Sequence, residues 1–277
     1  MKPCAFDYVK PRSLDEAVTR LGEGGNAKLL AGGQTLGPML NLRVVQPELL
    51  VDIRTLPEMT HWSEEGDGVL IGASVTHATI EDGKVPDPTG GTLRRVASGI
   101  AYRAVRNRGT IGGSLAHADP AADWLSSLSA LGAEAIIVGR SGERHVPVAT
   151  LATGIFETVI GEGEVLCAVR VKRLSATARF GYYKFCRKTG EFAEAMSAVL
   201  HDPERRVFRL VIAAADGPPI VLEDEAAGVA KGAALPARLD EALLVKALAA
   251  RGLADDPYKR QIHLVAARRA FAEARAA

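Results

Sequence analysis

The chain has 277 residues, enough for a full hydrophobic core and for two domains or three small lobes. Its composition of 47% hydrophobic and 24% charged residues is typical of a globular protein, and a net charge of +1 with dispersed Lys and Arg argues against a nucleic-acid partner. Three widely separated cysteines argue against a disulfide framework and against an iron–sulfur or zinc site built by this chain alone. Because the sequence lacks a signal segment and a long apolar run, we expect a cytoplasmic protein without a membrane span.

The first fifty residues alternate between strand and helix patterns. Ser13 and Glu16 form a capping box that starts a helix ending near Gly22, and Thr35 stands where it could cap a second helix. The expected strands are 6–9, 28–31 and 49–53. A β-α-β-α-β order with short links predicts a small parallel or mixed sheet.

From about Leu56 the pattern changes to short strands and small helices, so we expect an α+β middle lobe. Within it, Asp119-Pro120 is interpreted as a helix start, and residues 135–138 as a strand. Beyond Arg173 we expect an antiparallel sheet of strands 181–185, 195–200 and 207–213, followed by helices 239–250 and 257–276. The fold class is therefore α+β. The predicted division is 1–175, with lobes at about 1–55 and 56–175, and 176–277.

Two segments combine adjacent glycines with hydroxyl side chains. One runs from Leu29 to Leu36 with the sequence LLAGGQTL, and the other from Thr110 to Ser114 with the sequence TIGGS. Adjacent glycines let backbone N–H groups turn toward one concave spot, which is how proteins hold phosphate oxygens. A single glycine pair is most often only a turn, but two such segments suggest one diphosphate held from two sides.

Asp123 is expected one turn inside the helix that starts at Asp119-Pro120. On residue type alone its carboxylate could either serve a ligand or favour the helix dipole. His77 and His117 lie beside the interesting segments, but neither has a second ligand at metal spacing, so no role is assigned to them.

The segments AGGQTLGPMLNLR at 31–43 and RNRGTIGGSLAHADPAAD at 106–123 resemble the two signature segments of the FAD-binding medium subunit of molybdenum hydroxylases. Further similarity appears at Phe6-Asp7-Tyr8, at Tyr183-Lys184 and at 190–193. The chain departs from the family pattern where Thr35 replaces the common Ser, where Glu191 replaces the common Asp, and in a weak charge pattern at 220–228.

The resemblance implies FAD as the cofactor of this chain, in an FAD-binding domain of two lobes at 1–175 followed by a C-terminal medium-subunit domain. It places the first segment around the diphosphate and ribityl chain, the second segment on the opposite side, Asp123 at the polar middle of the cofactor, and Ile160 and Lys184 near the flavin ring. It implies neither a catalytic residue nor a metal site in this chain. The implied cofactor-binding residues are Leu29, Leu30, Ala31, Gly32, Gly33, Gln34, Thr35, Leu36, Thr110, Ile111, Gly112, Gly113, Ser114, Asp123, Ile160 and Lys184.

The resemblance also implies partners: an iron–sulfur small subunit and a large subunit with the molybdenum cofactor, assembled as a dimer of heterotrimers. Electrons would pass from the iron–sulfur subunit through FAD to an external acceptor. Ala116, Ala118, Pro120 and Ala121 are expected at the edge that meets the partner. Two alternatives stay open, a self-sufficient FAD-dependent oxidase and a non-catalytic nucleotide-binding module.

Overall fold

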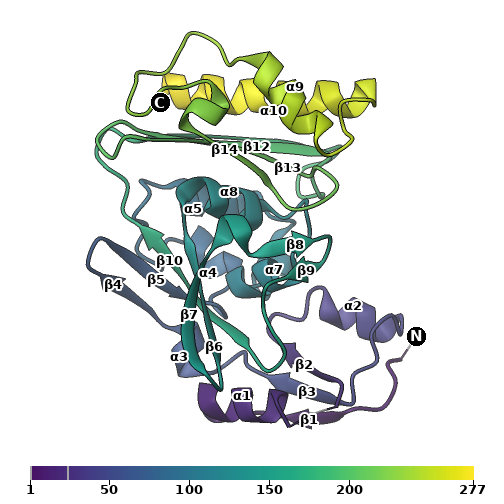
Figure 1. The fold of residues 1–277 in the computed structure, drawn as a ribbon. Coiled ribbons are helices and arrows are strands. Elements are labelled where there is room, and N and C mark those ends of the chain that lie inside the picture. The colour runs from purple at the N-terminus through teal and green to yellow at the C-terminus, as the bar shows by residue number, and fades with distance from the viewer. Residues whose placement is uncertain (1, 24) are drawn as a thin grey trace.

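The computed structural model describes residues 2–23 and 25–277. Sheets of three, five and four strands follow one another from the N-terminus to the C-terminus, which places the two ends of the chain in different lobes (Figure 1). This α+β arrangement confirms the predicted fold class.

The N-terminal sheet is parallel, in the order β1-β3-β2, as the β-α-β-α-β pattern predicts. The capping box forms in part: Ser13 Oγ accepts a hydrogen bond from the Glu16 N–H at 3.1 Å, whereas the Glu16 carboxylate accepts from the Arg12 N–H at 2.8 Å. The elements are β1 (Asp7–Val9), α1 (Leu14–Leu21), β2 (Ala27–Leu30), α2 (Leu36–Asn41) and β3 (Leu49–Asp52).

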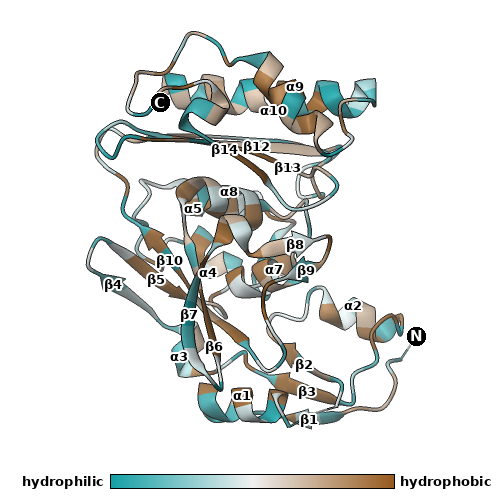
Figure 2. Cartoon of the chain, in the orientation of Figure 1, coloured by the Kyte–Doolittle hydropathy of each residue, from teal (hydrophilic) through white to brown (hydrophobic). Residues whose placement is uncertain are grey.

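The middle sheet is antiparallel throughout, in the order β4-β5-β10-β6-β7. Figure 2 shows apolar residues concentrated in the inner strands β5 and β6 and polar residues in the edge strand β7, a distribution that discourages edge-to-edge pairing. The strands are β4 (Trp62–Glu65), β5 (Gly68–Gly72), β6 (Glu134–Gly139), β7 (Gly142–Pro147) and β10 (Val165–Lys172), with a two-stranded ribbon of β8 (Ala152–Gly154) and β9 (Glu157–Thr158).

The middle lobe also contains short helices. They are α3 (Pro57–Thr60), α4 (His77–Glu81), α5 (Thr92–Ser98), α6 (Arg103–Arg106), α7 (Ile111–His117), α8 (Asp123–Leu131) and the 3-10 turn Val148–Thr150. Of these helices, α5 and α8 lie toward the C-terminal lobe and α3 lies near α1 (Figure 1). All nine residues of α8 are buried, because this helix lies between the middle sheet and the C-terminal sheet.

Helix α8 begins at Asp123, so the helix start predicted at Asp119-Pro120 is wrong. The Asp119 carboxylate accepts a hydrogen bond from the Ala121 N–H at 2.8 Å, and the Pro120 carbonyl accepts one from the Ala214 N–H at 3.0 Å. The Asp-Pro pair therefore makes a turn ahead of the helix, which is the other common use of these residues.

The C-terminal sheet is antiparallel and has four strands in the order β11-β12-β13-β14, one more than the sequence predicted. The fourth strand has only four residues and directly follows Gly217-Pro218-Pro219, a sequence typical of a loop, which hides the strand from a sequence-based prediction. Every residue of β12 is buried, because α8 packs on one face of the sheet and α10 on the other. The elements are β11 (Arg179–Phe185), β12 (Ala195–Asp202), β13 (Val207–Ala213), β14 (Ile220–Glu223), the 3-10 turn Asp224–Ala227, α9 (Glu241–Ala249) and α10 (Pro257–Ala276).

None of the helices in the described part of the chain combines the length and the apolar character that crossing a bilayer requires.

Candidate functional site

The first glycine segment turns sharply where β2 ends. Gly33 has a φ of +70°, a left-handed conformation that favours glycine. This residue makes the turn between β2 and α2. Within residues 2–23 and 25–277, the N–H groups of Gly32, Gly33, Gln34 and Thr35 donate no hydrogen bond. A run of unpaired N–H groups around a left-handed residue is the arrangement that binds anionic oxygens.

Thr35 stands at the residue before α2, but its hydroxyl makes no capping hydrogen bond within the described chain, so the predicted cap is wrong. Its backbone conformation is helical, which turns the hydroxyl away from the first free N–H groups of the helix. The side chain is exposed and is therefore available to a ligand.

The second glycine segment is a helix start. Thr110 is extended and its Oγ1 accepts from the Gly113 N–H at 3.0 Å, while the N–H groups of Ile111 and Gly112 donate to Val75 and Ala73. The Ser114 N–H donates to the Thr110 carbonyl at 3.0 Å. The prediction that this segment offers free N–H groups is therefore wrong. Thr110 is buried and Ser114 is half-buried.

Close packing explains the glycine at 112. A Cβ added there would lie 2.8 Å from the Cα and carbonyl oxygen of Ala73, a distance that real Cβ atoms do not reach. Gly113 is different, because an added Cβ would face Thr110 Oγ1 at 2.8 Å and Ala31 Cβ at 3.7 Å. The second segment therefore lies beside the first.

Gly32 makes the contact between the two segments. An added Cβ would collide with the carbonyl oxygen of Arg108 and lie 2.8 Å from the Gly109 Cα. The unpaired N–H groups of the first segment therefore lie next to the start of the second segment. These donors fit a diphosphate, because neutral N–H and O–H groups can hydrogen-bond to its oxygens without a lysine on each phosphate.

Asp123 and Lys184 form a buried ion pair between α8 and β11. Lys184 Nζ lies 3.1 and 3.0 Å from the two carboxylate oxygens, and the Tyr182 hydroxyl donates to Asp123 Oδ1 at 2.7 Å. Burial raises the pKa of Asp123, while the Lys184 charge and the Tyr182 hydrogen bond lower it. Burial also raises the pKa of Tyr182 well above its usual value. The sequence patterns contain nothing that points to Tyr182.

Two further predicted positions lie apart from this ion pair. Ile160 is half-buried just beyond β9, a strand that contacts α7, and its N–H donates to Thr158 Oγ1 at 3.3 Å. Ala118 is fully buried and its carbonyl accepts from the Phe156 N–H, so the expectation that Ala118 lines a partner edge is wrong. Ala116 is exposed, and Pro120 and Ala121 are half-buried.

His77 is a buried residue to which the sequence assigned no role. Its N–H donates to the Gly109 carbonyl at 2.9 Å, and its Nδ1 accepts from Trp124 Nε1 at 3.0 Å. Burial lowers the pKa of His77 to about 4, with a smaller contribution from the charge of Arg106. No local sequence pattern predicts this hydrogen bond, because Trp124 is 47 residues away from His77 in the chain.

We expect the stability of the protein to fall as the pH decreases from 6.5 to about 4. In this window the unfolded chain takes up a proton at His77, whose ordinary pKa is 6.5, whereas the folded chain does not until about pH 4. The contribution of neutral His77 to the free energy of unfolding is fully present above pH 6.5, and about 3 kcal/mol of it is lost between pH 6.5 and about 4. Urea unfolding at several pH values measures this slope. His77→Asn should flatten it; a variant with the full slope would contradict the assignment.

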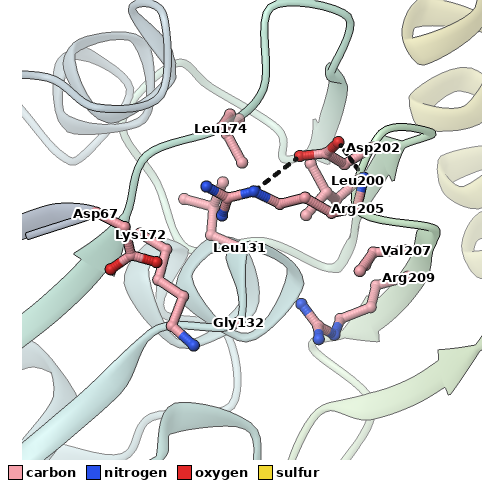
Figure 3. A pocket seen from close by; sticks show the side chains of 10 residues that line it. All are labelled: Asp67, Leu131, Gly132, Lys172, Leu174, Leu200, Asp202, Arg205, Val207 and Arg209. Carbon is pink, nitrogen blue, oxygen red and sulfur yellow. Dashed lines mark hydrogen bonds and ion pairs between the residues drawn. The ribbon is translucent and has the colours of Figure 1, made fainter.

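A cavity with a volume of about 410 Å³ lies elsewhere, between the middle and C-terminal lobes (Figure 3). Its lining contains none of the predicted cofactor-binding residues. The carboxylate of Asp202, which lines this cavity, accepts hydrogen bonds from the Ser175 N–H, the Ser175 hydroxyl and the Arg205 N–H. In the described ranges no group of three or more His, Cys, Asp or Glu side chains could hold a metal ion.

Comparison with known proteins gives a consistent set of similarities. Residues 4–172 match the family described as the FAD binding domain in molybdopterin dehydrogenase. The carbon monoxide dehydrogenase medium chain of Hydrogenophaga pseudoflava is 40% identical over 201 residues, 72% of this chain and 70% of that protein. The 6-hydroxypseudooxynicotine dehydrogenase complex subunit alpha of Paenarthrobacter nicotinovorans is 38% identical over 220 residues, covering 78% and 74%.

Solved structures extend the similarity to the whole chain. A carbon monoxide dehydrogenase structure from Hydrogenophaga pseudoflava has a TM-score of 0.86 at 34% identity, covering 100% of this chain and 99% of that one. Quinoline 2-oxidoreductase from Pseudomonas putida 86 has a TM-score of 0.83 at 30% identity with the same coverage. The C-terminal lobe, which lies beyond the matched residues 4–172, is therefore included in the structural likeness.

Proposed function

The chain belongs to the FAD-binding medium subunits of the molybdenum hydroxylases, and from this membership we propose how its residues serve that role. It is the FAD-containing electron-transfer subunit of a multi-subunit oxidoreductase. When bound, the flavin supplies the redox chemistry, and the protein supplies position and electrostatics.

We propose that the diphosphate lies in the cradle between the two glycine segments. The observation that carries this assignment is the run of unpaired N–H groups at 32–35, which the close contact of Gly32 with Arg108 and Gly109 holds beside the second segment. Leu29, Leu30 and Ala31 lead into the cradle at the end of β2, and Leu36 begins α2 on its far side. Gly33 shapes the cradle, and Gly32 allows the two segments to touch.

We propose that Asp123, Lys184 and Ile160 serve the remainder of the cofactor. In this role Lys184 contributes a positive charge. The Asp123 carboxylate largely neutralises the field of that charge, because the ammonium nitrogen lies 3.0 Å from a carboxylate oxygen. The pair can still offer a hydrogen bond, because the ammonium has three N–H donors and the two carboxylate oxygens of Asp123 take two of them.

The partners are part of the proposal. We propose that this subunit joins an iron–sulfur small subunit and a molybdenum-cofactor large subunit in a dimer of heterotrimers in the cytoplasm. We also propose a division into an FAD-binding domain, 1–175, with lobes at about 1–55 and 56–175, and a C-terminal domain, 176–277. The names of the relatives, which include medium chains and subunits of complexes, support an assembly of several chains.

The test is to purify this chain alone and together with the other two subunits from the same source. Alone, it should carry flavin absorbance and oxidise no organic substrate, because the substrate-binding cofactor is on another chain. In the complex, its flavin absorbance should bleach when substrate is added. A chain that cannot take up FAD, or that turns over substrate alone at the rate of the complex, would overturn the proposal. Light scattering of the complex measures its stoichiometry.

A further inference from the structure

Gly109, the residue just before the second glycine segment, is packed against both Gly32 and His77. Gly32 of the first segment lies against Gly109, so closely that an added Cβ would be 2.8 Å from the Gly109 Cα. Gly109 also lies against the ring of His77, because a Cβ added to Gly109 would be 2.9 Å from Cδ2 and Nε2 of that ring. The imidazole therefore touches the same glycine that contacts the first segment.

The ring of His77 is held from behind. Trp124 is fully buried, and its indole N–H donates to His77 Nδ1 at 3.0 Å, with ring centroids 6.1 Å apart. An accepting Nδ1 means that the ring is neutral and carries its proton on Nε2. The backbone of the same residue is also fixed, because the His77 N–H donates to the Gly109 carbonyl at 2.9 Å.

Trp124 directly follows Asp123 at the start of α8. The His77–Trp124 hydrogen bond therefore connects the helix that carries the Asp123–Lys184 pair with the segment that leads into Thr110. Thr76 and Thr110 form an antiparallel bridge beside it, and the Ile111 N–H donates to Val75 at 3.1 Å. Backbone hydrogen bonds therefore join the second segment to residues 73–77. The His77–Trp124 hydrogen bond in turn joins residue 77 to α8.

We propose that His77 and Trp124 are positioning residues for FAD: their hydrogen bond sets the spacing between the two glycine segments and hence the affinity of the cradle for the diphosphate. This inference rests on the proposed function. Neither residue needs to touch the cofactor. Because a hydrogen-bonded cradle depends on donors placed within a few tenths of an ångström, a small shift of Gly109 is transmitted to Gly32 and weakens several contacts at once.

The experiment is a double-mutant cycle with FAD affinity as its readout. The protein is stripped of flavin, its folding is checked by circular dichroism, and FAD binding is titrated by quenching of flavin fluorescence. His77→Leu and Trp124→Phe should each weaken FAD binding about tenfold, the upper range for losing one hydrogen bond. The double variant should lose no more than either single variant, because both remove the same interaction.

Two further variants separate positioning from general stability. His77→Asn keeps an acceptor near the position of Nδ1 and should restore most of the affinity that His77→Leu loses. His263→Leu removes another buried imidazole, one that bonds to Lys259 and Ala214 in the C-terminal lobe. It should lower the melting temperature without changing FAD affinity.

The outcomes are distinct. If the wild-type chain takes up no FAD, the proposed function fails. If the wild-type chain binds FAD and the folded His77→Leu variant binds it equally well, the positioning inference alone fails. Losses that add in the double variant, or an equal loss of affinity in His263→Leu, would also overturn it.

Discussion

Replacing Gly32 by alanine should abolish FAD retention. The added Cβ would collide with the carbonyl oxygen of Arg108 and with the Gly109 Cα, which are backbone atoms and cannot turn aside as a flexible side chain can. The two glycine segments would have to move apart, and the hydrogen-bond donors on their two sides could no longer reach one diphosphate. Flavin absorbance per mole of purified protein measures the effect.

Gly37→Ala is the matched control for this substitution. Gly37 lies in α2, five residues after Gly32 and just past the end of the first glycine segment, and an added Cβ there would meet no neighbouring group within 4 Å. Alanine should stabilise the helix slightly and leave flavin content at the wild-type level. Equal flavin content in Gly32→Ala and Gly37→Ala would refute the cradle.

Lys184→Met should destabilise the protein by about 3–5 kcal/mol at neutral pH, because it leaves the buried Asp123 carboxylate without its cation. The loss should shrink as the pH falls. In the variant, burial keeps the pKa of Asp123 above its unfolded value of 3.8. Between these two pKa values the folded state holds a proton that the unfolded state has released. The free energy of unfolding therefore decreases as the pH rises through this range. Chemical unfolding measured across the acidic range tests the sign.

The double variant Asp123→Asn with Lys184→Met provides the control. It removes both charges and should recover most of the lost stability, without the pH dependence of Lys184→Met. Two outcomes would show that the ion pair does not hold α8 to β11. One is that Lys184→Met loses the same free energy of unfolding at acidic and neutral pH. The other is that the double variant is no more stable than Lys184→Met.

Local patterns predicted the elements whose signals lie within a few residues of one another. The parallel N-terminal sheet follows from the alternation of short strands and helices, and the helix expected at 257–276 is found as α10, Pro257–Ala276. Ser13 caps its helix because its partner N–H is three residues away. The adjacency of the two glycine segments was also inferred, since two anion-binding patterns in one chain suggested a shared ligand.

Long-range partners were beyond such reasoning. The carboxylate of Asp123 was expected to be open to the cofactor, but Lys184 is 61 residues away in sequence and Tyr182 is 59, and no pattern announces that they meet. The second segment was expected to have free N–H groups, yet its backbone pairs with residues 73–75, whose role only the packed fold reveals. His77 was set aside for want of a nearby partner for the same reason.

Strand β12 has a consequence for how the protein unfolds. It is hydrogen-bonded on both edges, to β11 and β13, and covered on both faces, by α8 of the middle lobe and by α10. Its amides can exchange with solvent only when the middle and C-terminal lobes both come apart, so they should be among the slowest to exchange and report global opening. The family match ends at residue 172, but because β12 ties the two regions together, we expect them to melt as one cooperative unit.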